Sequence, residues 1–384
     1  MRENASKRAK PVPPRRGVVH SGLTVGRANQ GATSEGRAVV AVGVEMIWSY
    51  PWRFNRLARE WRELARPVPS TGRLHPLPQN ASMAVPFRYH PVSPANRKIA
   101  VYIHAFWVPE MLDDIERALE NIPFPFDLYF TTDTLSKLDH ISARFGGAMA
   151  IITKNIGRDI YPKLYAMGHL HDGYDYVLHI HTKKSQHRDQ LKDWRQFLWD
   201  HLLGSPEIVC SIIDIFEQCP DVGMVAPQHL RFIRAFVRGD EEFKEIAAPL
   251  ARKFGVDVGK LTEIDFPSGS MFWARPKALE PLLRLHLNPS DFPEEKGQIA
   301  GTIAHAIERL FFVSCEAAGF KWVKIAVPKW HSVKVQIQSV SDPAIVKSFV
   351  SRRNVSLLTR DCLFRKAQAR SQTANHLDAL YDDS

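Results

Sequence analysis

From Lys98 onward, short runs rich in β-branched and aromatic residues alternate with segments of helical periodicity, and this alternation restricts the possible folds most strongly. The expected strands are residues 99–103, 126–131, 148–153, 174–181 and 222–227, and the expected helices are residues 109–121, 160–169, 190–203, 206–218 and about 301–318. Such alternation predicts an α/β, Rossmann-like, mostly parallel sheet flanked by helices. These sheets bind ligands outside the carboxyl ends of their strands, so the residues that follow each strand are the first candidates for a site.

The composition is that of a soluble globular protein, because 45% of the 384 residues are hydrophobic and 24% are charged. The longest apolar stretches, such as 38–44 and 310–313, are far shorter than the roughly 18 residues of a membrane-spanning helix. The basic N-terminus is not followed by the apolar core of a signal peptide, so we expect a cytoplasmic protein. No CxxC pair occurs, which argues against a disulfide framework and a thiolate zinc site. The four cysteines are Cys210, Cys219, Cys315 and Cys362.

The net charge of +10 is concentrated near the N-terminus. Residues 1–98 hold 17 Lys and Arg against 5 Asp and Glu, whereas the remaining residues hold 34 against 36. This distribution argues against a nucleic-acid-binding core and indicates a basic appendage that meets phosphates, of lipid or of another polyanion. Residues 1–45 are rich in Pro, Gly, Ser and Arg and lack periodicity, so we expect a disordered basic extension.

Residues 46–97 are expected to hold an amphipathic helix and a Pro-rich linker. Within 52–66, apolar residues including Trp61 recur at helical spacing and arginines take the remaining positions. The apolar stripe either packs on the main domain or lies on an anionic inner-membrane surface, with Trp at the interface. The linker, 67–94, leads to a main domain expected at 98–328, and residues 329–384 are expected to form a C-terminal extension.

The first candidate motif, Asn155-Ile156-Gly157-Arg158-Asp159-Ile160, follows the third expected strand and leads into a helix. Gly157 permits an unusual backbone angle, and the planar donor fork of Arg158 suits phosphate or carboxylate. Asp159 is a candidate site acid, although the N-cap of the following helix would equally account for an acid there.

The second motif, His179-Ile180-His181-Thr182-Lys183-Lys184-Ser185, ends the fourth expected strand. Because side chains alternate along a strand, His179 and His181 point to the same face, where they either chelate a metal or line one wall of a cleft. No third ligand is near in sequence, so the lysines and the two hydroxyls fit a diphosphate better. A solvated loop would also contain such residues.

Two further motifs lie in the second half of the chain. Ser268-Gly269-Ser270 precedes an aromatic strand, and its small residues let the backbone approach a ligand, although an ordinary turn has the same composition. In the helix 301–318, His305 and Glu308 are three residues apart on one face and can share a site, whereas Glu308 with Arg309 could equally be surface charge.

Taken together, NIGRDI, HIHTKKS, FPSGSMFWAR and GTIAHAIERLF, in this order and spacing, resemble the rhamnan synthesis protein F family of bacterial polysaccharide glycosyltransferases. The resemblance covers residues 98–328. It implies a GT-A-like fold, a nucleotide-diphospho-sugar donor such as dTDP-rhamnose, and a growing lipid-linked glycan as acceptor in polysaccharide or lipopolysaccharide synthesis. A fold-level resemblance leaves a second reading open, a catalytically inactive glycan- or nucleotide-binding component of an assembly complex.

The resemblance also implies roles for individual residues. Glu308, followed by a glycine before the next strand, resembles the general base of inverting enzymes. Asp133 resembles the acid that contacts the nucleoside, although the segment 131–134 could be only a helix cap. The Asp-X-Asp motif that holds a metal in many GT-A enzymes is replaced here by the segment 179–185, so no divalent metal is expected to have an anchor. Lys183 and Lys184, with Arg158, would then stabilise the departing diphosphate.

Overall fold

The computed structural model describes residues 81–91, 96–170, 173–182, 193–231, 233, 241–261, 264–294, 296, 301–331, 336–353, 357–358 and 362–363. These residues all belong to one compact unit, Leu57–Ser384. A second unit, Met1–Arg56, lies outside the described residues. The expected disordered extension 1–45 and the basic helix 52–66 also lie outside them.

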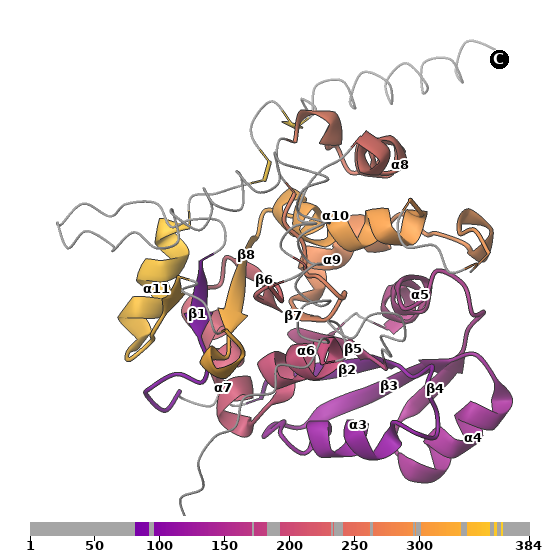
Figure 1. Cartoon of the computed structure of the whole chain (residues 1–384), viewed down its shortest axis with the longest axis horizontal. Coiled ribbons are helices and arrows are strands. Elements are labelled where there is room, and N and C mark those ends of the chain that lie inside the picture. Colours follow the sequence, from indigo (N-terminus) through magenta and orange to yellow (C-terminus); the bar gives the residue numbers. More distant parts are fainter. Residues whose placement is uncertain are drawn as a thin grey trace, which may run out of the picture. The chain divides into compact units, whose positions relative to one another are not determined.

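A nine-stranded sheet forms the centre of the described region, in the order β4-β3-β2-β5-β7-β6-β8-β1-β9 (Figure 1). Its strands are β1 (Ser82–Ala84), β2 (Ile99–His104), β3 (Phe126–Thr132), β4 (Met149–Ile152), β5 (Tyr176–His181), β6 (Val222–Pro227), β7 (Phe272–Ala274), β8 (Lys321–Ala326) and β9 (Ile337–Gln338). All neighbouring pairs are parallel except those of β7, which runs antiparallel to β5 and β6. The expected α/β fold with a mostly parallel sheet is confirmed.

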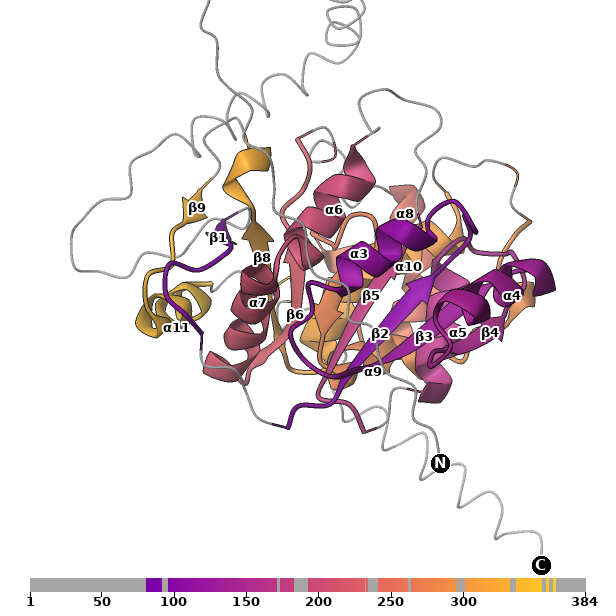
Figure 2. The ribbon, with the colours of Figure 1, turned by 90° about the horizontal axis from the view of Figure 1, so that it is seen from below.

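Helices cover both faces of this sheet (Figures 1 and 2). On one face lie α3 (Leu112–Leu119), α4 (Leu135–Arg144), α6 (Trp194–Leu203), α7 (Pro206–Gln218) and α11 (Pro343–Arg352). On the other lie α5 (Ile160–Leu170), α8 (Glu241–Arg252), α9 (Pro276–Leu283) and α10 (Ile303–Ala317). Three short 3-10 helices are described, at Val258–Lys260, Pro289–Asp291 and Pro328–Trp330.

The central strands are buried on both faces, which explains their continuous apolar character. In β2 and β5 every residue is buried, and successive side chains enter opposite clusters of the core. Ile103 and Ile180 face α3, α6 and α7, whereas Tyr102 and Val177 face α5 and α10. The same alternation turns His104, His179 and His181 toward the α5 and α10 face, at the carboxyl edge of the sheet.

Every strand and helix predicted from Lys98 onward is present within a few residues of its expected bounds, and the structure adds α4, α8 and α9, which the periodicity did not predict. The structure differs from the expected layout at both ends of the domain. β1 comes from the expected linker 67–94, and it pairs with β8 and β9, so it lies inside the sheet. β9 and α11 come from the expected extension 329–384, and α11 packs Val346 and Phe349 into the core. Such short strands carry no periodicity of their own, and only their distant partners define them.

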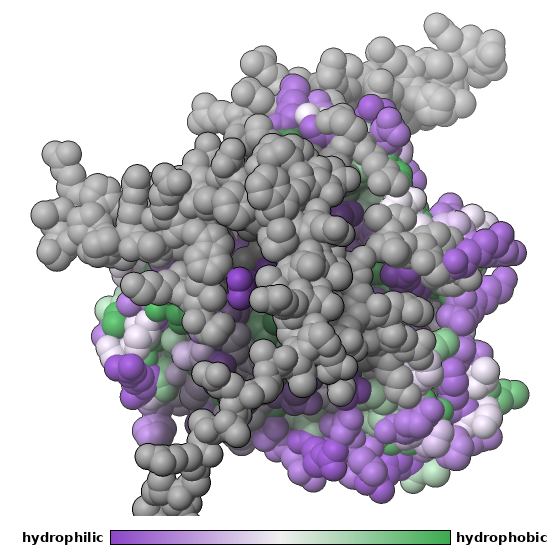
Figure 3. Space-filling model, in the orientation of Figure 1, coloured by the Kyte–Doolittle hydropathy of each residue, from purple (hydrophilic) through white to green (hydrophobic). Residues whose placement is uncertain are grey.

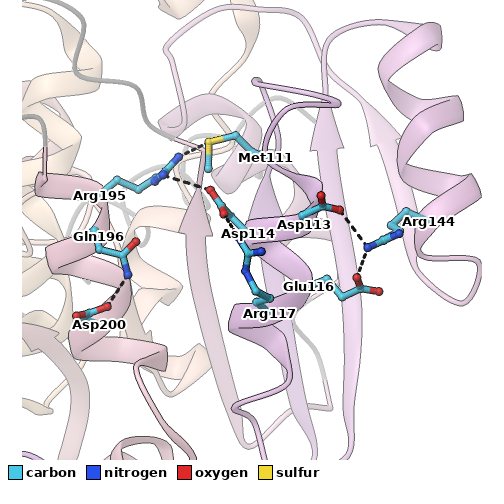
Figure 4. A network of polar contacts seen from close by, with 9 residues as sticks. All are labelled: Met111, Asp113, Asp114, Glu116, Arg117, Arg144, Arg195, Gln196 and Asp200. Atoms are coloured by element: carbon cyan, nitrogen blue, oxygen red, sulfur yellow. Dashed lines mark hydrogen bonds and ion pairs between the residues drawn. The ribbon is translucent and has the colours of Figure 1, made fainter. Parts of the chain in front are cut away.

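Surface ion pairs connect the helices on the first face (Figure 4). Arg144 of α4 donates to Asp113 at 3.1 Å and also to Glu116, both on α3. Arg195 of α6 lies 3.3 Å from Asp114, so α3 is joined to a helix on either side. In Figure 3, hydrophilic residues predominate over the described surface around α3 and α4. We interpret this region as a solvated face.

Within the described part of the chain, no helix is both long and apolar enough to cross a membrane.

Candidate functional site

Two turns with left-handed backbone conformation meet at the carboxyl edge of the sheet. Gly157 and Arg158 have φ of 63° and 56°, and Gly269 and Ser270 have φ of 84° and 57°. Residues other than glycine rarely adopt such angles, and each costs of order 1–3 kcal/mol. A strained turn persists only where its surroundings hold it in place, so the contacts of these two turns define the site.

The turn at Gly269 and Ser270 is held by three other elements. Gly269 N–H donates to Oε1 of Glu308 on α10 at 2.7 Å, and its carbonyl lies 2.8 Å from Nε2 of His181. The Ser270 carbonyl lies 2.8 Å from Nδ1 of His179 and 3.0 Å from Nζ of Lys163 on α5. Three of the four sequence motifs therefore meet at one backbone turn. The helices α5 and α10, which carry Lys163 and Glu308, lie on the same face of the sheet (Figure 1).

The turn at Gly157 and Arg158 reaches the same helix. Nη1 of Arg158 lies 3.3 Å from Nε2 of His305, in the first turn of α10. Because a guanidinium only donates, this histidine nitrogen accepts, and Nδ1 carries the proton toward Thr302 Oγ1 at 2.7 Å. A side chain at Gly157 would collide with Phe292, since a Cβ there would lie 2.5 Å from its ring. The first motif thus joins the fourth at an exposed part of the site.

Lys163 also contacts the candidate site, and none of the four sequence motifs contains it. Its side chain is 0% exposed, and its ammonium lies 3.4 Å from Oδ2 of Asp159. Asp159 also lies 3.8 Å from Nε2 of His181. Burial lowers the pKa of Lys163 to about 8, against the opposing charges of Asp159 and Glu308. The sequence holds one indication of this role, because Lys163 is a lone lysine among apolar helix residues, one turn after Asp159.

Two buried histidines of the site, His104 and His179, are held neutral. Burial lowers the pKa of His104 to about 4, although the Asp159 carboxylate opposes the shift. Burial, together with the charge of Lys163, lowers the pKa of His179 well below its usual range. With Nδ1 of His179 donating to Ser270, its buried Nε2 finds no hydrogen-bond partner within the described residues. The neutral His179 ring therefore acts as a donor to the Ser270 carbonyl and not as a cation.

Other predicted site residues have structural contacts. The hydroxyl of Thr182, expected to contact a diphosphate, accepts the backbone N–H groups of Phe106 and Trp107 at 2.8 and 3.0 Å. Asp133 forms an ion pair with Lys137 at 2.5 Å, within its own turn. Thr134, and not Asp133, caps the following helix α4. Lys183, Lys184 and Ser185 lie outside the described residues.

Ser268 belongs to a second buried network. Its Oγ lies 3.0 Å from Nδ1 of His229, whose Nε2 lies 2.8 Å from Asp265 Oδ1. The other oxygen of Asp265 accepts from Lys324 of β8 at 2.5 Å. Burial opposes ionisation, but the charges of Lys324 and His229 hold the pKa of Asp265 well below its usual range. This network fixes the start of the strained turn to β6 and β8.

Among the described residues, no three His, Cys, Asp or Glu side chains are grouped closely enough to hold a metal ion. The site holds instead the guanidinium of Arg158 and the carboxylates of Asp159 and Glu308. Such a set can bind an anionic group and exchange a proton without a metal.

The fold is that of an α/β protein, and the candidate site lies at the carboxyl edge of its mostly parallel sheet. Residues 77–319 match the family described as rhamnan synthesis protein F. This match covers more than half of the chain, and the chain belongs to that family.

Among curated proteins, the chain is similar to the uncharacterized protein WxcX of Xanthomonas campestris pv. campestris, with 38% identity over 227 residues in strain B100. A second strain of the same pathovar gives 37% identity over 227 residues. The matched region is 58% of this chain and 32% of that protein, so the chain spans about a third of the length of these relatives.

Similar solved structures include a CMP:2-keto-3-deoxy-manno-octonic acid synthetase complexed with CTP, at 15% identity and a TM-score of 0.31, covering 67% of this chain and 98% of that one. Glucosyl-3-phosphoglycerate synthase from Mycobacterium tuberculosis, in complex with Mn2+, UDP and glucosyl-3-phosphoglycerate, matches at 13% identity and a TM-score of 0.29, covering 68% and 82%. At these TM-scores the similarity supports no conclusion about activity.

Proposed function

We propose that this chain is a glycosyltransferase that moves a sugar from a nucleotide-diphospho-sugar to a growing cell-surface polysaccharide or lipopolysaccharide. The family name, rhamnan synthesis protein F, supports the polysaccharide context. One structural observation carries the proposal. Gly269 contacts both Glu308 and His181 at the carboxyl edge, and Arg158 contacts His305 on the same helix as Glu308. A carboxylate and a guanidinium at one edge are the two groups that this chemistry requires.

In the proposed reaction, the Glu308 carboxylate takes the proton of an acceptor hydroxyl while that oxygen attacks the anomeric carbon. The bond from the anomeric carbon to the nucleoside diphosphate breaks in the same step, and the diphosphate leaves with the bonding electron pair. One displacement inverts the anomeric configuration. The Gly269 N–H, at 2.7 Å from Oε1, orients the carboxylate for this role.

The departing diphosphate needs donors and positive charge. Arg158 provides a guanidinium next to His305, and Lys183 and Lys184 are proposed to add two ammonium groups from the segment that follows β5. In this scheme His305 orients Arg158, and no divalent metal is required. The donor would be a nucleotide sugar such as dTDP-rhamnose, and the acceptor a lipid-linked glycan.

Replacement of Glu308 by Gln tests the proposed base. Glutamine keeps an oxygen that can accept the Gly269 N–H, so donor affinity should change by less than about threefold while turnover falls by about 10²–10⁴-fold. A panel of dTDP-, UDP- and GDP-sugars would be offered to both proteins, with binding measured by calorimetry and transfer by nucleotide release. Loss of donor affinity in the variant would contradict the assigned role. Absence of saturable binding of every donor to wild type would contradict the proposal itself.

A second candidate function is a catalytically inactive glycan- or nucleotide-binding component of an assembly complex. The observation that favours it is the engaged state of Glu308, whose Oε1 already accepts a backbone N–H. The two candidate functions differ in whether nucleotide is released in the presence of acceptor. The inactive protein would bind nucleotide sugars or glycan with equal affinity in wild type and Glu308→Gln, and neither would release nucleotide in the presence of acceptor glycan.

The proposed place of action is the inner face of the plasma membrane. Its support is the basic, Trp-bearing segment 52–66, which stays a sequence-based prediction because it lies outside the described residues. Deletion of residues 1–66 should release the protein from vesicles that contain anionic lipid. Unchanged co-sedimentation of the truncated protein would exclude this role.

A further inference from the structure

A buried lysine on α5 connects this helix to α10 and to the turn before β7. The ammonium of Lys163 contacts Asp159 at 3.4 Å and the Ser270 carbonyl at 3.0 Å. It also lies 4.4 Å from the ring centre of Phe311 on α10 and 5.2 Å from that of Phe272 on β7. Lysine side chains are almost never fully buried unless they are paired, so the position requires an explanation.

The charges around Lys163 come from each element packed against it. Asp159 precedes its own helix, Glu308 lies on α10 and acts on it electrostatically, and His179 and His181 extend from β5. His179 is neutral, because its pKa is far below its usual range. Among the described residues, the carboxylates of Asp159 and Glu308 therefore both act on the buried ammonium of Lys163.

We propose that Lys163 is the internal counter-cation of the site, which keeps the Asp159 and Glu308 carboxylates ionised and lets the site accept an anionic diphosphate. This inference rests on the proposed function for the identity of the ligand. Lys163 is a positioning residue in this scheme, because it acts through Asp159, Glu308 and the Ser270 turn.

The proposal predicts that the affinity for nucleoside diphosphates depends on pH. With the pKa of Lys163 near 8, the ammonium is present at pH 7 and is lost as the pH rises above about 8. Its loss leaves two carboxylates without their internal cation, and repulsion of a bound diphosphate then increases. Nucleoside diphosphate affinity should therefore fall on the alkaline side.

The experiment measures binding of UDP, GDP and dTDP, each alone, to the full chain between pH 6.5 and pH 10. Wild-type affinity should fall by about tenfold across pH 8, the scale of one lost charge interaction of about 1.4 kcal/mol. Lys163→Met should bind about tenfold more weakly at pH 7 and show no such step. Lys163→Arg keeps its charge at every pH tested and should bind without the alkaline loss. Lys277→Met, an exposed lysine on α9, is the matched control and should follow wild type.

A measurement without ligand separates this inference from the proposed function. In wild type the depressed pKa of Lys163 means that the unfolded chain holds more protons between about pH 8 and its ordinary value near 10.4, so stability should rise with pH in that interval. Lys163→Met should lack this rise in urea unfolding. If no nucleoside diphosphate binds wild type, the proposed function fails, and the unfolding comparison still decides the role of Lys163. Parallel pH profiles of wild type and Lys163→Met, in binding or in unfolding, would overturn the proposal, and Lys163→Arg provides the comparison if the Met variant does not fold.

Discussion

The backbone N–H of Gly269 donates to Oε1 of Glu308 across 2.7 Å, and this bond joins the strained turn before β7 to the middle of α10. Gly269 and Glu308 are 39 residues apart in sequence. The bond fixes the position of the carboxylate relative to His181, which contacts the carbonyl of the same glycine at 2.8 Å. Glu308 is consequently both a structural acceptor and the proposed base.

This double role predicts different effects for two substitutions of Glu308. Glu308→Ala removes the acceptor of a partly buried N–H and should lower the free energy of unfolding by about 1–3 kcal/mol. Glu308→Gln retains an acceptor oxygen and should cost less than about 1 kcal/mol. Urea unfolding of both variants measures the difference. Equal destabilisation would show that the hydrogen bond to Gly269 contributes nothing.

The strained turn predicts that substitutions at Gly269 and Ser270 have opposite effects on stability. Gly269→Ala would place a Cβ at positive φ and 2.6 Å from Cδ1 of the buried Leu198, so it should cost more than about 2 kcal/mol. Ser270→Gly removes the strain of a serine at φ 57° and keeps the carbonyl that Lys163 and His179 contact. It should leave stability unchanged or raise it by up to about 1 kcal/mol. Thermal unfolding of both variants tests this contrast, and a strongly destabilised Ser270→Gly would refute it.

Buried histidines predict that acid destabilises the fold. Burial lowers the pKa of His201 to about 3, below its ordinary value near 6.5. The unfolded chain therefore binds more protons below pH 6.5, and stability present at pH 7 is lost as the pH falls. Between pH 7 and pH 5 this residue alone should account for about 2 kcal/mol.

The variant His201→Gln isolates that contribution, because it removes the titrating ring from α6. Its unfolding free energy should fall less steeply with acid than that of wild type, whereas the exposed His140→Gln on α4 should keep the wild-type slope. Identical slopes for all three proteins would mean that acid protonates His201 in the folded state as readily as in the unfolded chain.

Buried and exposed ion pairs should differ sharply in their effect on stability. Asp265→Asn leaves the buried Lys324 and the neighbouring Arg353 without their carboxylate and should cost about 3–5 kcal/mol. Arg144→Gln breaks exposed pairs with Asp113 and Glu116 (Figure 4) and should cost at most about 1 kcal/mol. Chemical denaturation compares the two, and similar losses would contradict the assignment of the Asp265 network to the core.

The sequence by itself determined the α/β class, the strands from β2 to β6 and the helices between them except α4, and the motifs that carry His181, Gly269 and Glu308. It could do so because these elements are long and periodic, and because residues after strands of a parallel sheet share one edge. Only the tertiary structure decided that β1 and β9 join the sheet, since strands of two or three residues are defined by their partners. Tertiary packing also decided that Thr182 holds a loop and that Lys163 is buried among Asp159, Phe272 and Phe311. A side chain acquires such a role from the residues folded around it, and these lie far away along the chain.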